Sequence, residues 1–423
     1  MTDRLPCKNP ECANRILPET AARTQGFCMP CVNARKKQEY DDYIRLNRKT
    51  INVFAGVSDP VEMLKRVHQP REHDPLISWT PCPFPTDELY LRLTADQASD
   101  MAAYAAVLLD EGNHSEAMEI ILCLVAFTGA NLDDCLRKWA FDDDVDFWSA
   151  LPFHRSPPDV RDRLLQQVET DAENRNLLLQ CLAWIGDEVV VESFARWRQE
   201  PPSWRDSLYV PPEDYAREAG WELTGEGLQR NLYFSSCFHL QKQALPQPER
   251  LRVATARGDN CPNCTLKLTH LFEIAPAVVG LSAEDWPDMI RIMTCECCSA
   301  YGTVYGKIDS QGQAHWSDKN APSTLAKRNA DDWLLLPVNA VELAEPRAPL
   351  FAADQFLPTT FSQLGGHPTW IQDAEYPQCP ACTQSMMFVA QIDYQDIDQY
   401  GEGLIYGFIC PECRTTATTF QQT

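Results

Sequence analysis

The sequence predicts a multidomain α+β protein with a cysteine-bearing knuckle at the N-terminus, an α-helical middle and a β-rich C-terminal part built from two repeated units. Three observations predict this class. The chain has 423 residues, more than one hydrophobic core usually organises. Apolar residues recur at helical spacing between residues 86 and 200. After residue 250, cysteine pairs alternate with short apolar segments typical of strands.

The composition excludes several classes of protein. Hydrophobic residues make up 44% of the chain and charged residues 23%, so the main body is neither disordered nor fibrous. The longest clear apolar run, residues 120–127, is far shorter than the ~20 residues that a membrane helix needs. The opening MTDRLPCKNPEC lacks the apolar region of a signal peptide. We therefore expect a cytoplasmic protein without a membrane part.

The net charge of −23 is unevenly distributed. Residues 1–75 carry 13 basic and 10 acidic side chains, residues 76–250 carry 14 and 30, and residues 251–423 carry 10 and 20. An acidic body repels phosphate, which disfavours nucleic-acid binding outside the N-terminal segment. The basic side chains near the N-terminus form either a solvated helix face or a contact with nucleic acid or an acidic partner. They are Arg35, Lys36, Lys37, Arg45, Arg48 and Lys49.

Twelve of the 18 cysteines fall into six close pairs, and five of these pairs have C-x-x-C spacing. Without a secretory signal, a disulfide framework is the weaker interpretation. Two such turns can place four thiolates around one ion, which favours structural zinc, about three ions per chain, over an iron–sulfur cluster or redox dithiols. The expected ligand sets are Cys7, Cys12, Cys28 and Cys31; Cys261, Cys264, Cys295 and Cys298; and Cys379, Cys382, Cys410 and Cys413. Cys297 could replace Cys298 as a ligand.

The N-terminal 1–50 are expected to be a zinc knuckle followed by a basic helix over 34–50. The knuckle is too short to bury a core, so the metal would hold it. Residues 51–85 are rich in proline and histidine toward their end. We predict a connector there with little regular structure.

An α-helical domain is predicted over residues 86–200. Thr94 and Gln97 have the spacing of a capping box. Further helices are expected at 115–127, 131–140, from Pro158 onward, at 172–185 and at 187–199. Gly186 would end one helix and Asp187 would cap the next. Residues 201–250 are predicted to be an aromatic and proline-rich connection with a strand at 231–240 and a linker after it.

The segment LAWIGDEVVVESFARW at 182–197 resembles the turn between the helices of a HEAT-type repeat. This resemblance implies an extended helical surface, which such repeats use for binding.

An internal repeat is predicted in the C-terminal part, with units at 251–345 and 346–423. CPNC at 261–264 and CPAC at 379–382 each precede a strand-like segment, and a second C-x-x-C pair follows. The leading pairs are 118 residues apart and the trailing pairs 115. The pattern predicts two zinc-ribbon-like units that pack as related β-rich halves.

Between these units lies LGGHPTWIQ, followed by CPAC, FVAQID and GLIYGFICPEC. These motifs resemble the YwqG-like family of uncharacterised bacterial proteins and the eukaryotic programmed-cell-death-protein-two family. The resemblance covers about 60 residues. It implies a signature turn and a glutamine, Gln391, on the central strand. It also implies binding roles: a chaperone-like grip on a basic ribosomal client, or toxin immunity.

The signature turn has two interpretations. Glycines permit a backbone turn closed to other residues, and proline stiffens its exit, so the turn could be a structural corner. Alternatively, it could face a ligand. The residues concerned are Gly365, Gly366, His367, Pro368 and Trp370.

No catalytic motif of the common nucleotide-binding, hydrolase or metalloprotease types is present. Cys237 and His239 could form a thiol–imidazole pair or simply pack together in a strand. The acidic group Asp142, Asp143, Asp144 and Asp146 lacks the pattern of a calcium loop and favours a solvated loop. We therefore expect no catalytic residues and more readily a non-enzyme than an enzyme.

Three functional hypotheses follow. The first is a zinc-stabilised binding protein whose acidic surface captures a basic partner, either a toxin or a chaperone client. The second is a nucleic-acid or ribosome-associated factor that uses residues 1–50. The third is a hydrolase with a pocket near His367 or Cys237.

Overall fold

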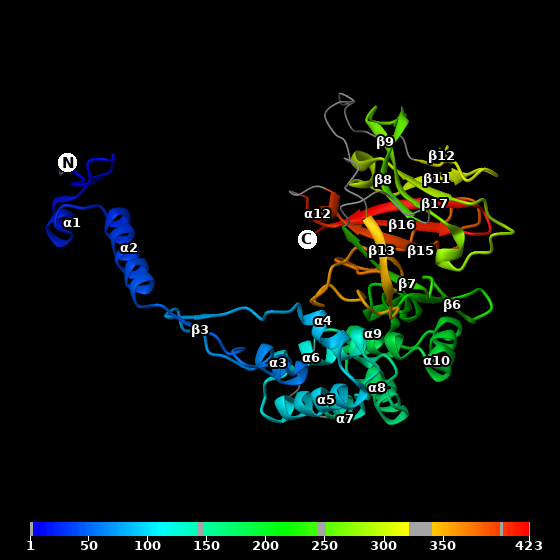
Figure 1. The fold of residues 1–423 in the computed structure, drawn as a ribbon, viewed down its shortest axis with the longest axis horizontal. Coiled ribbons are helices and arrows are strands. Elements are labelled where there is room, and N and C mark those ends of the chain that lie inside the picture. The colour runs from blue at the N-terminus through cyan, green and yellow to red at the C-terminus, as the bar shows by residue number, and fades with distance from the viewer. Residues whose placement is uncertain (1–2, 142–147, 243–250, 321–340, 398–400, 423) are drawn as a thin grey trace. The chain divides into compact units, whose positions relative to one another are not determined.

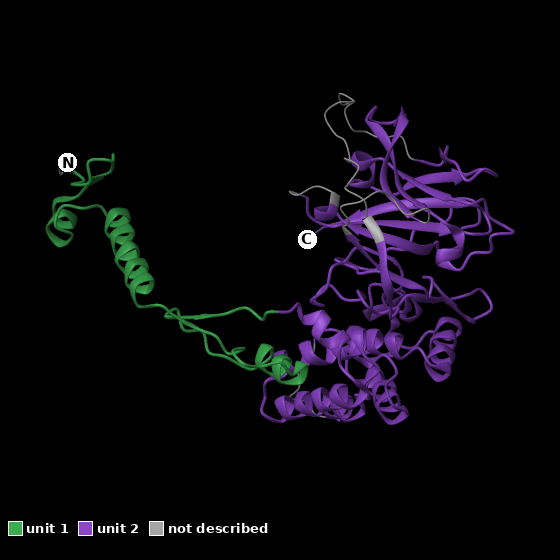
Figure 2. Ribbon diagram, in the orientation of Figure 1, with its two compact units in different colours: residues 1–83 green, residues 84–423 purple. Residues whose placement is uncertain are grey.

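The computed structural model describes residues 3–141, 148–242, 251–320, 341–397 and 401–422. The chain forms two compact units, residues 1–83 and 84–423 (Figure 2). The second unit combines helices with a large antiparallel sheet, so the protein has a mixed α+β fold (Figure 1). The expected linker at 243–250 and the acidic group at 142–146 lie outside the described residues.

The N-terminal unit consists of short elements. They are β1 (Leu5–Pro6), β2 (Arg15–Ile16), α1 (Pro18–Arg23), α2 (Met29–Asn47), β3 (Lys49–Ile51), α3 (Pro60–Val67) and β4 (Ile77–Trp79). Strands β1 and β2 are antiparallel, and β3 and β4 are parallel. Helix α2 buries none of its side chains. It begins earlier than the predicted residue 34, because the second cysteine pair of the knuckle lies at its start.

Part of the segment predicted to be a connector with little regular structure forms helix α3, so that prediction was wrong for residues 60–67. Asp59 accepts a hydrogen bond from the Glu62 amide at 2.9 Å, and Pro60 occupies the first turn of α3. This is an N-cap followed by a proline that is compatible with the first helical turn. The helix was missed because the many prolines of this region were interpreted as a sign of irregular structure.

The helical part of the C-terminal unit agrees closely with the predicted helices. It contains α4 (Thr86–Leu91), α5 (Ala95–Asp110), α6 (His114–Phe127), α7 (Asp133–Phe141), the 3₁₀ turn η1 (Leu151–Phe153), α8 (Pro158–Thr170), α9 (Arg175–Ile185) and α10 (Glu188–Gln199). Both halves of the capping box between Thr94 and Gln97 are formed. Gly186 has φ +54°, and Asp187 accepts a hydrogen bond from the Val190 amide at 3.0 Å. These boundaries therefore have the local causes that the sequence indicated, whereas helix α4 was not predicted.

The connection after the helices contains the 3₁₀ turns η2 (Arg205–Ser207) and η3 (Pro212–Ala219) and the hairpin of β5 (Trp221–Leu223) and β6 (Gln229–Asn231). The strand predicted at 231–240 is not continuous. Residue Asn231 ends β6, and a new strand, β7, begins at Cys237. The interruption arises because β6 pairs with β5, whereas β7 pairs with strands of a different sheet.

Two antiparallel sheets form the β-rich part. The smaller has the order β10-β9-β8, and the larger the order β12-β11-β17-β16-β15-β14-β7-β13. Their bounds are β7 (Cys237–Lys242), β8 (Leu251–Asn260), β9 (Lys267–Ile274), β10 (Ile290–Thr294), β11 (Val304–Ile308), β12 (Ala314–Trp316), β13 (Val341–Arg347), β14 (Gln363–Gly365), β15 (Met387–Asp393), β16 (Leu404–Cys410) and β17 (Thr415–Gln421). Short elements, η4 (Pro276–Val279), α11 (Glu296–Ser299) and α12 (Tyr394–Ile397), connect them.

Strand β16 lies between two hydrophobic clusters, and its residues alternate between them. Ile405 and Ile409 pack in the cluster that includes Phe272 of β9. Tyr406 and Phe408 pack in the other cluster, with Trp370. Because successive side chains of a strand point to opposite faces, both faces of the large sheet are covered at this strand.

The two C-terminal segments share an order of elements but not a common pairing. In each, a cysteine pair precedes a strand, and a second pair follows the next strand. After that second pair, β17 returns to pair with β16, whereas β11 pairs with β17 and β12. The segments thus differ from the two related halves expected from the sequence. Strands β8, β9 and β10 of the first segment form the smaller sheet, whereas β11 and β12 join the larger sheet beside strands of the second segment.

Candidate metal centres

Twelve cysteines form three clusters whose sulfur atoms lie within 4.8 Å of one another in each cluster. The clusters are Cys7, Cys12, Cys28 and Cys31; Cys261, Cys264, Cys295 and Cys298; and Cys379, Cys382, Cys410 and Cys413. The structure therefore brings together the three sets of four predicted from spacing. Each set could hold a metal ion such as zinc.

The distances between sulfurs match a tetrahedral metal centre. A metal–sulfur bond of about 2.3 Å implies edges of about 3.8 Å between sulfurs in a regular tetrahedron. The Sγ atoms of Cys7 and Cys31 lie 3.8 Å apart, and those of Cys382 and Cys410 lie 3.7 Å apart. All of these cysteines are free thiols, so the clusters are not disulfide bridges.

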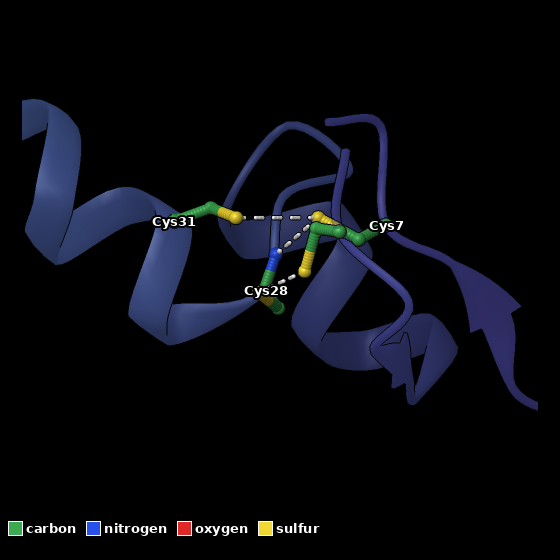
Figure 3. Close-up of side chains that lie close together, drawn as sticks. Cys7, Cys28 and Cys31 are labelled. Atoms are coloured by element: carbon green, nitrogen blue, oxygen red, sulfur yellow. Dashed lines mark hydrogen bonds between the residues drawn. The ribbon is translucent and has the colours of Figure 1, made fainter. Parts of the chain in front are cut away.

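The first cluster joins the β1–β2 loop to the start of α2 (Figure 3). The amide of Cys28 donates to the sulfur of Cys7 at 3.2 Å. Asn14 and Asn9 donate from their side-chain amides to Cys28 and Cys31, each at 3.5 Å. The hydrogen bond from Asn14 and a backbone hydrogen bond lower the pKa of Cys28 to about 6. The environment therefore favours a thiolate, the form that binds metal.

Asn9 and Asn14 were not identified from the sequence as part of the site. Each lies two residues after a cysteine of the leading pair. At this spacing, a short amide side chain can reach back toward the sulfurs of the same turn. The C-x-N pattern is therefore a signal that sequence reasoning could have used.

The second and third clusters are built from knuckles at the ends of strands. The amide of Thr265 donates to the carbonyl of Cys261 at 2.9 Å, and Thr383 repeats this contact with Cys379 at 2.8 Å. Both threonines have positive φ, +71° and +65°. Arg414, which follows the last cysteine of the third cluster, also has positive φ, +50°. A left-handed residue after the second cysteine closes the turn and aims both sulfurs at one point.

Backbone amides point at the leading sulfur of these knuckles. Burial raises the pKa of Cys379, but amide hydrogen bonds from Ala381 and Cys382 lower it to about 7 overall. Hydrogen bonds within the second cluster, from Cys295 and Cys298, hold the pKa of Cys261 well below its usual value. The leading knuckle of each of these two clusters thus stabilises a negative sulfur, whereas the pKa values of the trailing cysteines are raised.

The structure places Cys298 in the second cluster, with its sulfur 3.7 Å from that of Cys261. The neighbouring Cys297 is 6% exposed and lies outside the set of four. The short helix α11 separates the two side chains in direction, because adjacent residues of a helix do not share a face.

The signature turn is buried, which favours the structural corner over the ligand-facing turn. Gly365 and Gly366 have φ +65° and +71°. A Cβ at Gly365 would lie 1.7 Å from the carbonyl oxygen of Ser236, so only glycine allows the turn to close against the chain before β7. Pro368 is buried as well, and of the predicted turn residues Trp370 lines a described cavity.

His367 is fully buried at this turn. Its ring lies 4.7 Å from that of Trp184, and its Nε2 is 3.0 Å from the carbonyl oxygen of Glu218. Burial lowers its pKa to about 4. The ring is therefore neutral and holds η3 against the turn.

Gln391, expected on the central strand from the family resemblance, lies in β15, and its side chain forms hydrogen bonds with residues next to the turn. Its Oε1 accepts from the amide of Thr369 at 2.9 Å, and its Nε2 donates to the carbonyl of Phe361 at 2.7 Å. Both groups of its amide are thus used within the fold.

Cys237 and His239 have separate environments. The thiol of Cys237 is buried near the side chain of Gln363, and burial raises its pKa to about 12. His239 instead contacts the hydroxyl of Thr360. A buried thiol with a raised pKa is a poor nucleophile.

A cavity of about 340 Å³ was not predicted from the sequence. Its aromatic walls come from Trp148, Trp184, Phe356 and Trp370. These residues belong to distant segments, and single aromatic residues carry no sequence signal of a shared site.

In the described part of the chain, no helix is long and apolar enough to cross a membrane.

Comparison with known proteins gives one informative relative. The chain is 60% identical over 425 residues to the uncharacterized protein YpfL of Salmonella typhimurium, and the match covers the whole of both chains. No protein-family profile matches the chain. No solved structure matches it.

Proposed function

Since the chain belongs to the family of the uncharacterized protein YpfL, we propose from its own geometry that it is a non-enzymatic binding protein. Three structural zinc ions hold its small elements together, and its acidic C-terminal unit captures a basic protein partner.

The observation that carries this proposal is the combination of closed cysteine sets with a strongly acidic unit. Four cysteines already complete the tetrahedral coordination that zinc prefers, so no position remains for a reactive water. Of the other groups considered for hydrolysis, His367 is buried and neutral and Cys237 is a buried thiol. The geometry therefore favours a structural metal and a binding role.

The charge distribution supports a basic partner. Residues 1–83 carry 13 basic and 10 acidic side chains, whereas residues 84–423 carry 24 and 50. An excess of 26 negative charges on one unit accelerates encounter with a positively charged protein and disfavours acidic competitors. The resemblance to the YwqG-like and programmed-cell-death-protein-two families suggests the same class of partner, a toxin or a ribosomal protein.

The finer architecture is part of the proposal. The left-handed Gly186 followed by the capping Asp187 supports a HEAT-like helix pair in the α-helical part. The recurring order of knuckle and strand supports two zinc-ribbon-like units of common origin. A helical surface of this kind would provide the docking face.

A second candidate function uses the N-terminal unit. Helix α2 buries no side chain and carries Arg35, Lys36 and Lys37 on consecutive positions. Tyr40 and Tyr43 of the same helix are 56% and 54% exposed. Exposed basic and aromatic side chains together are typical of surfaces that bind nucleic acid. This surface favours a ribosome-associated or nucleic-acid-binding factor as the alternative.

The full chain, immobilised as bait in extract of the organism that encodes it, tests both candidates. Captured proteins are identified by mass spectrometry at low and at high salt. We expect basic proteins that are released as salt rises, because surface electrostatics is screened. A captured set with no basic bias, or one indifferent to salt, would reject the proposal.

A matched variant separates the two candidates. Replacing Arg35, Lys36 and Lys37 by glutamate leaves the fold intact, because α2 buries none of its side chains. Capture of basic proteins should persist in this variant. If the captured material is nucleic acid that disappears with the substitutions, the second candidate is correct instead.

A further inference from the structure

The C-terminal unit contains a cavity of about 340 Å³ that none of the metal centres uses. Its lining comes from five segments of the chain: the residues around η1, helix α9, the end of η3, and residues 353–356 and 370–373. We call it the aromatic–acidic cavity, since its distinctive walls are aromatic rings and carboxylates. They are Trp148, Trp184, Phe356, Trp370, Glu218, Asp354 and Asp373.

Two of the four aromatic walls are fixed and two form an accessible rim. Trp184 and Trp370 are each 8% exposed. Trp184 packs on His367, and the ring of Trp370 lies 5.0 Å from that of Tyr406. Trp148 and Phe356 are 44% and 60% exposed, and their rings meet edge to face at 4.7 Å. A planar group entering between these pairs would meet aromatic surfaces already in position.

Asp354 and Glu218 are carboxyl groups of the lining that have no positive partner among the described residues. Asp354 accepts hydrogen bonds from the hydroxyl of Ser149 at 2.6 Å and the amide of Phe356 at 2.9 Å. Glu218 accepts from the amide of Ala374 at 2.9 Å. Among the described residues, neither carboxylate forms an ion pair, and burial raises the pKa of both.

Such an arrangement is unfavourable without a ligand. A mostly buried carboxylate loses hydration, and the one hydrogen bond to Glu218 or the two to Asp354, all from neutral groups, replace only part of it. A cation placed between Asp354 and Glu218 would compensate both. Asp373, exposed at the entrance, adds a third negative charge that would attract the same ligand.

We propose that the aromatic–acidic cavity binds a guanidinium group, presented by an arginine side chain of the basic protein partner. The guanidinium is planar, stacks on tryptophan and donates hydrogen bonds in two directions to carboxylates. An ammonium group would satisfy the charge but would use the flat aromatic walls less well. The proposal rests on the proposed function and specifies which side chain of the partner is held.

The signature turn acquires a role in this arrangement. His367 contacts both Trp184 and the backbone of Glu218, and Trp370 follows the turn by three residues. The buried turn thus positions one carboxylate and two aromatic walls. Of the turn residues, Trp370 lines the cavity, whereas the others are absent from its lining and act from behind it.

Binding is measured on the full-length protein by tryptophan fluorescence and calorimetry with N-acetyl-arginine-N-methylamide as the probe. We expect saturable binding of this probe, binding at least three-fold weaker for the lysine analogue, and none for the citrulline analogue. Citrulline keeps the shape but lacks the charge. Equal binding of arginine and citrulline derivatives would overturn the proposal.

Free arginine distinguishes the two sources of a guanidinium. The amino and carboxyl groups of an arginine within a protein are part of peptide bonds. If the site binds such an arginine, the blocked derivative should bind at least as tightly as free arginine. Binding of free arginine at least ten-fold tighter would show a site for the amino acid and would overturn the assignment to a partner protein.

Matched variants locate the site. Glu218→Gln and Asp354→Asn should each weaken probe binding about ten-fold, and Phe356→Ala about three-fold. The controls Glu226→Gln and Tyr209→Ala remove an exposed carboxylate and an exposed ring outside the cavity and should change nothing. Phe356 is itself largely exposed, so its variant keeps the test valid if a carboxylate variant fails to fold. Unchanged binding in a folded Asp354→Asn or Phe356→Ala variant would refute the site.

The inference and the proposed function can fail separately. If the probe binds in the cavity but no basic protein is captured by the full chain, the guanidinium site stands and the proposed function fails. If basic proteins are captured equally well by the wild type and by a folded Asp354→Asn variant whose probe binding is about ten-fold weaker, the proposed function stands and this inference fails.

Discussion

The second cluster provides the sharpest test of the metal centres, because two adjacent cysteines have different places in the structure. Cys298 belongs to the set of four and Cys297 does not. We expect Cys298→Ser to lower the zinc content from about three ions per chain to about two under mild chelation. Cys297→Ser should leave it at about three. The two substitutions remove the same atom one residue apart, so each is the control for the other.

The magnitude follows from the coordination geometry. Structural zinc sites have apparent binding free energies of about 10–16 kcal/mol, and the sulfur–sulfur distances of 3.4 and 3.7 Å show that four thiolates share the centre. One lost ligand of four corresponds to about 2.5–4 kcal/mol, or roughly two to three orders of magnitude in affinity. The assay is competition with a chromogenic chelator, with total zinc measured by mass spectrometry.

Two results would refute this reasoning. Loss of zinc in Cys297→Ser equal to that in Cys298→Ser would show that the cluster is assembled differently. Retention of three ions by Cys298→Ser at the same chelator concentration would show that four thiolates are not needed. A single ion per chain in the wild-type protein would reject the repeated site altogether.

Three further predictions concern the fold. Gly365→Ala should lower the free energy of unfolding by about 3 kcal/mol or more, because residue 365 has positive φ and the new Cβ would collide with a backbone oxygen. The control Gly225→Ala places its Cβ in open space and should leave thermal unfolding nearly unchanged. Asp187→Ala should cost at least about 1–2 kcal/mol, through loss of the helix cap and of the ion pair with Arg161, whereas exposed Glu192→Ala should cost little in urea unfolding. Burial lowers the pKa of His367 to about 4, so below pH 6.5 this histidine is protonated in the unfolded chain but stays neutral in the folded protein. The free energy of unfolding should therefore fall by about 2 kcal/mol between pH 7 and pH 5 because of His367. Its imidazole nitrogen resonances should stay those of the neutral ring at pH 5, and a titration midpoint near pH 6.5 would contradict this.

The helices were predictable because their causes are local. The capping pair Thr94 and Gln97 and the stop at Gly186 each act within one or two turns. Helix α3 was missed although its cap, Asp59 followed by Pro60, is equally local. The surrounding prolines and histidines were given more weight than this short signal.

The strands were harder, because their partners lie far away in the chain. β11 and β17 are adjacent in the sheet although about 110 residues separate Gly306 from its partner Thr416. The interruption between β6 and β7 has the same origin, since each strand follows a different partner. Apolar alternation predicts that a segment is a strand but not which edge it joins.

The sequence by itself determined the cysteine sets, because a C-x-x-C turn fixes the direction of two sulfurs over four residues, and two such turns complete one tetrahedron. It also determined the helix boundaries at Thr94 and Gly186 and the segregation of charge. Only the tertiary structure decided that the signature turn is buried and that Trp148, Trp184, Phe356 and Glu218 surround one cavity. The physical reason is that a cavity wall depends on packing between segments distant in the chain, for which spacing along the sequence carries no information.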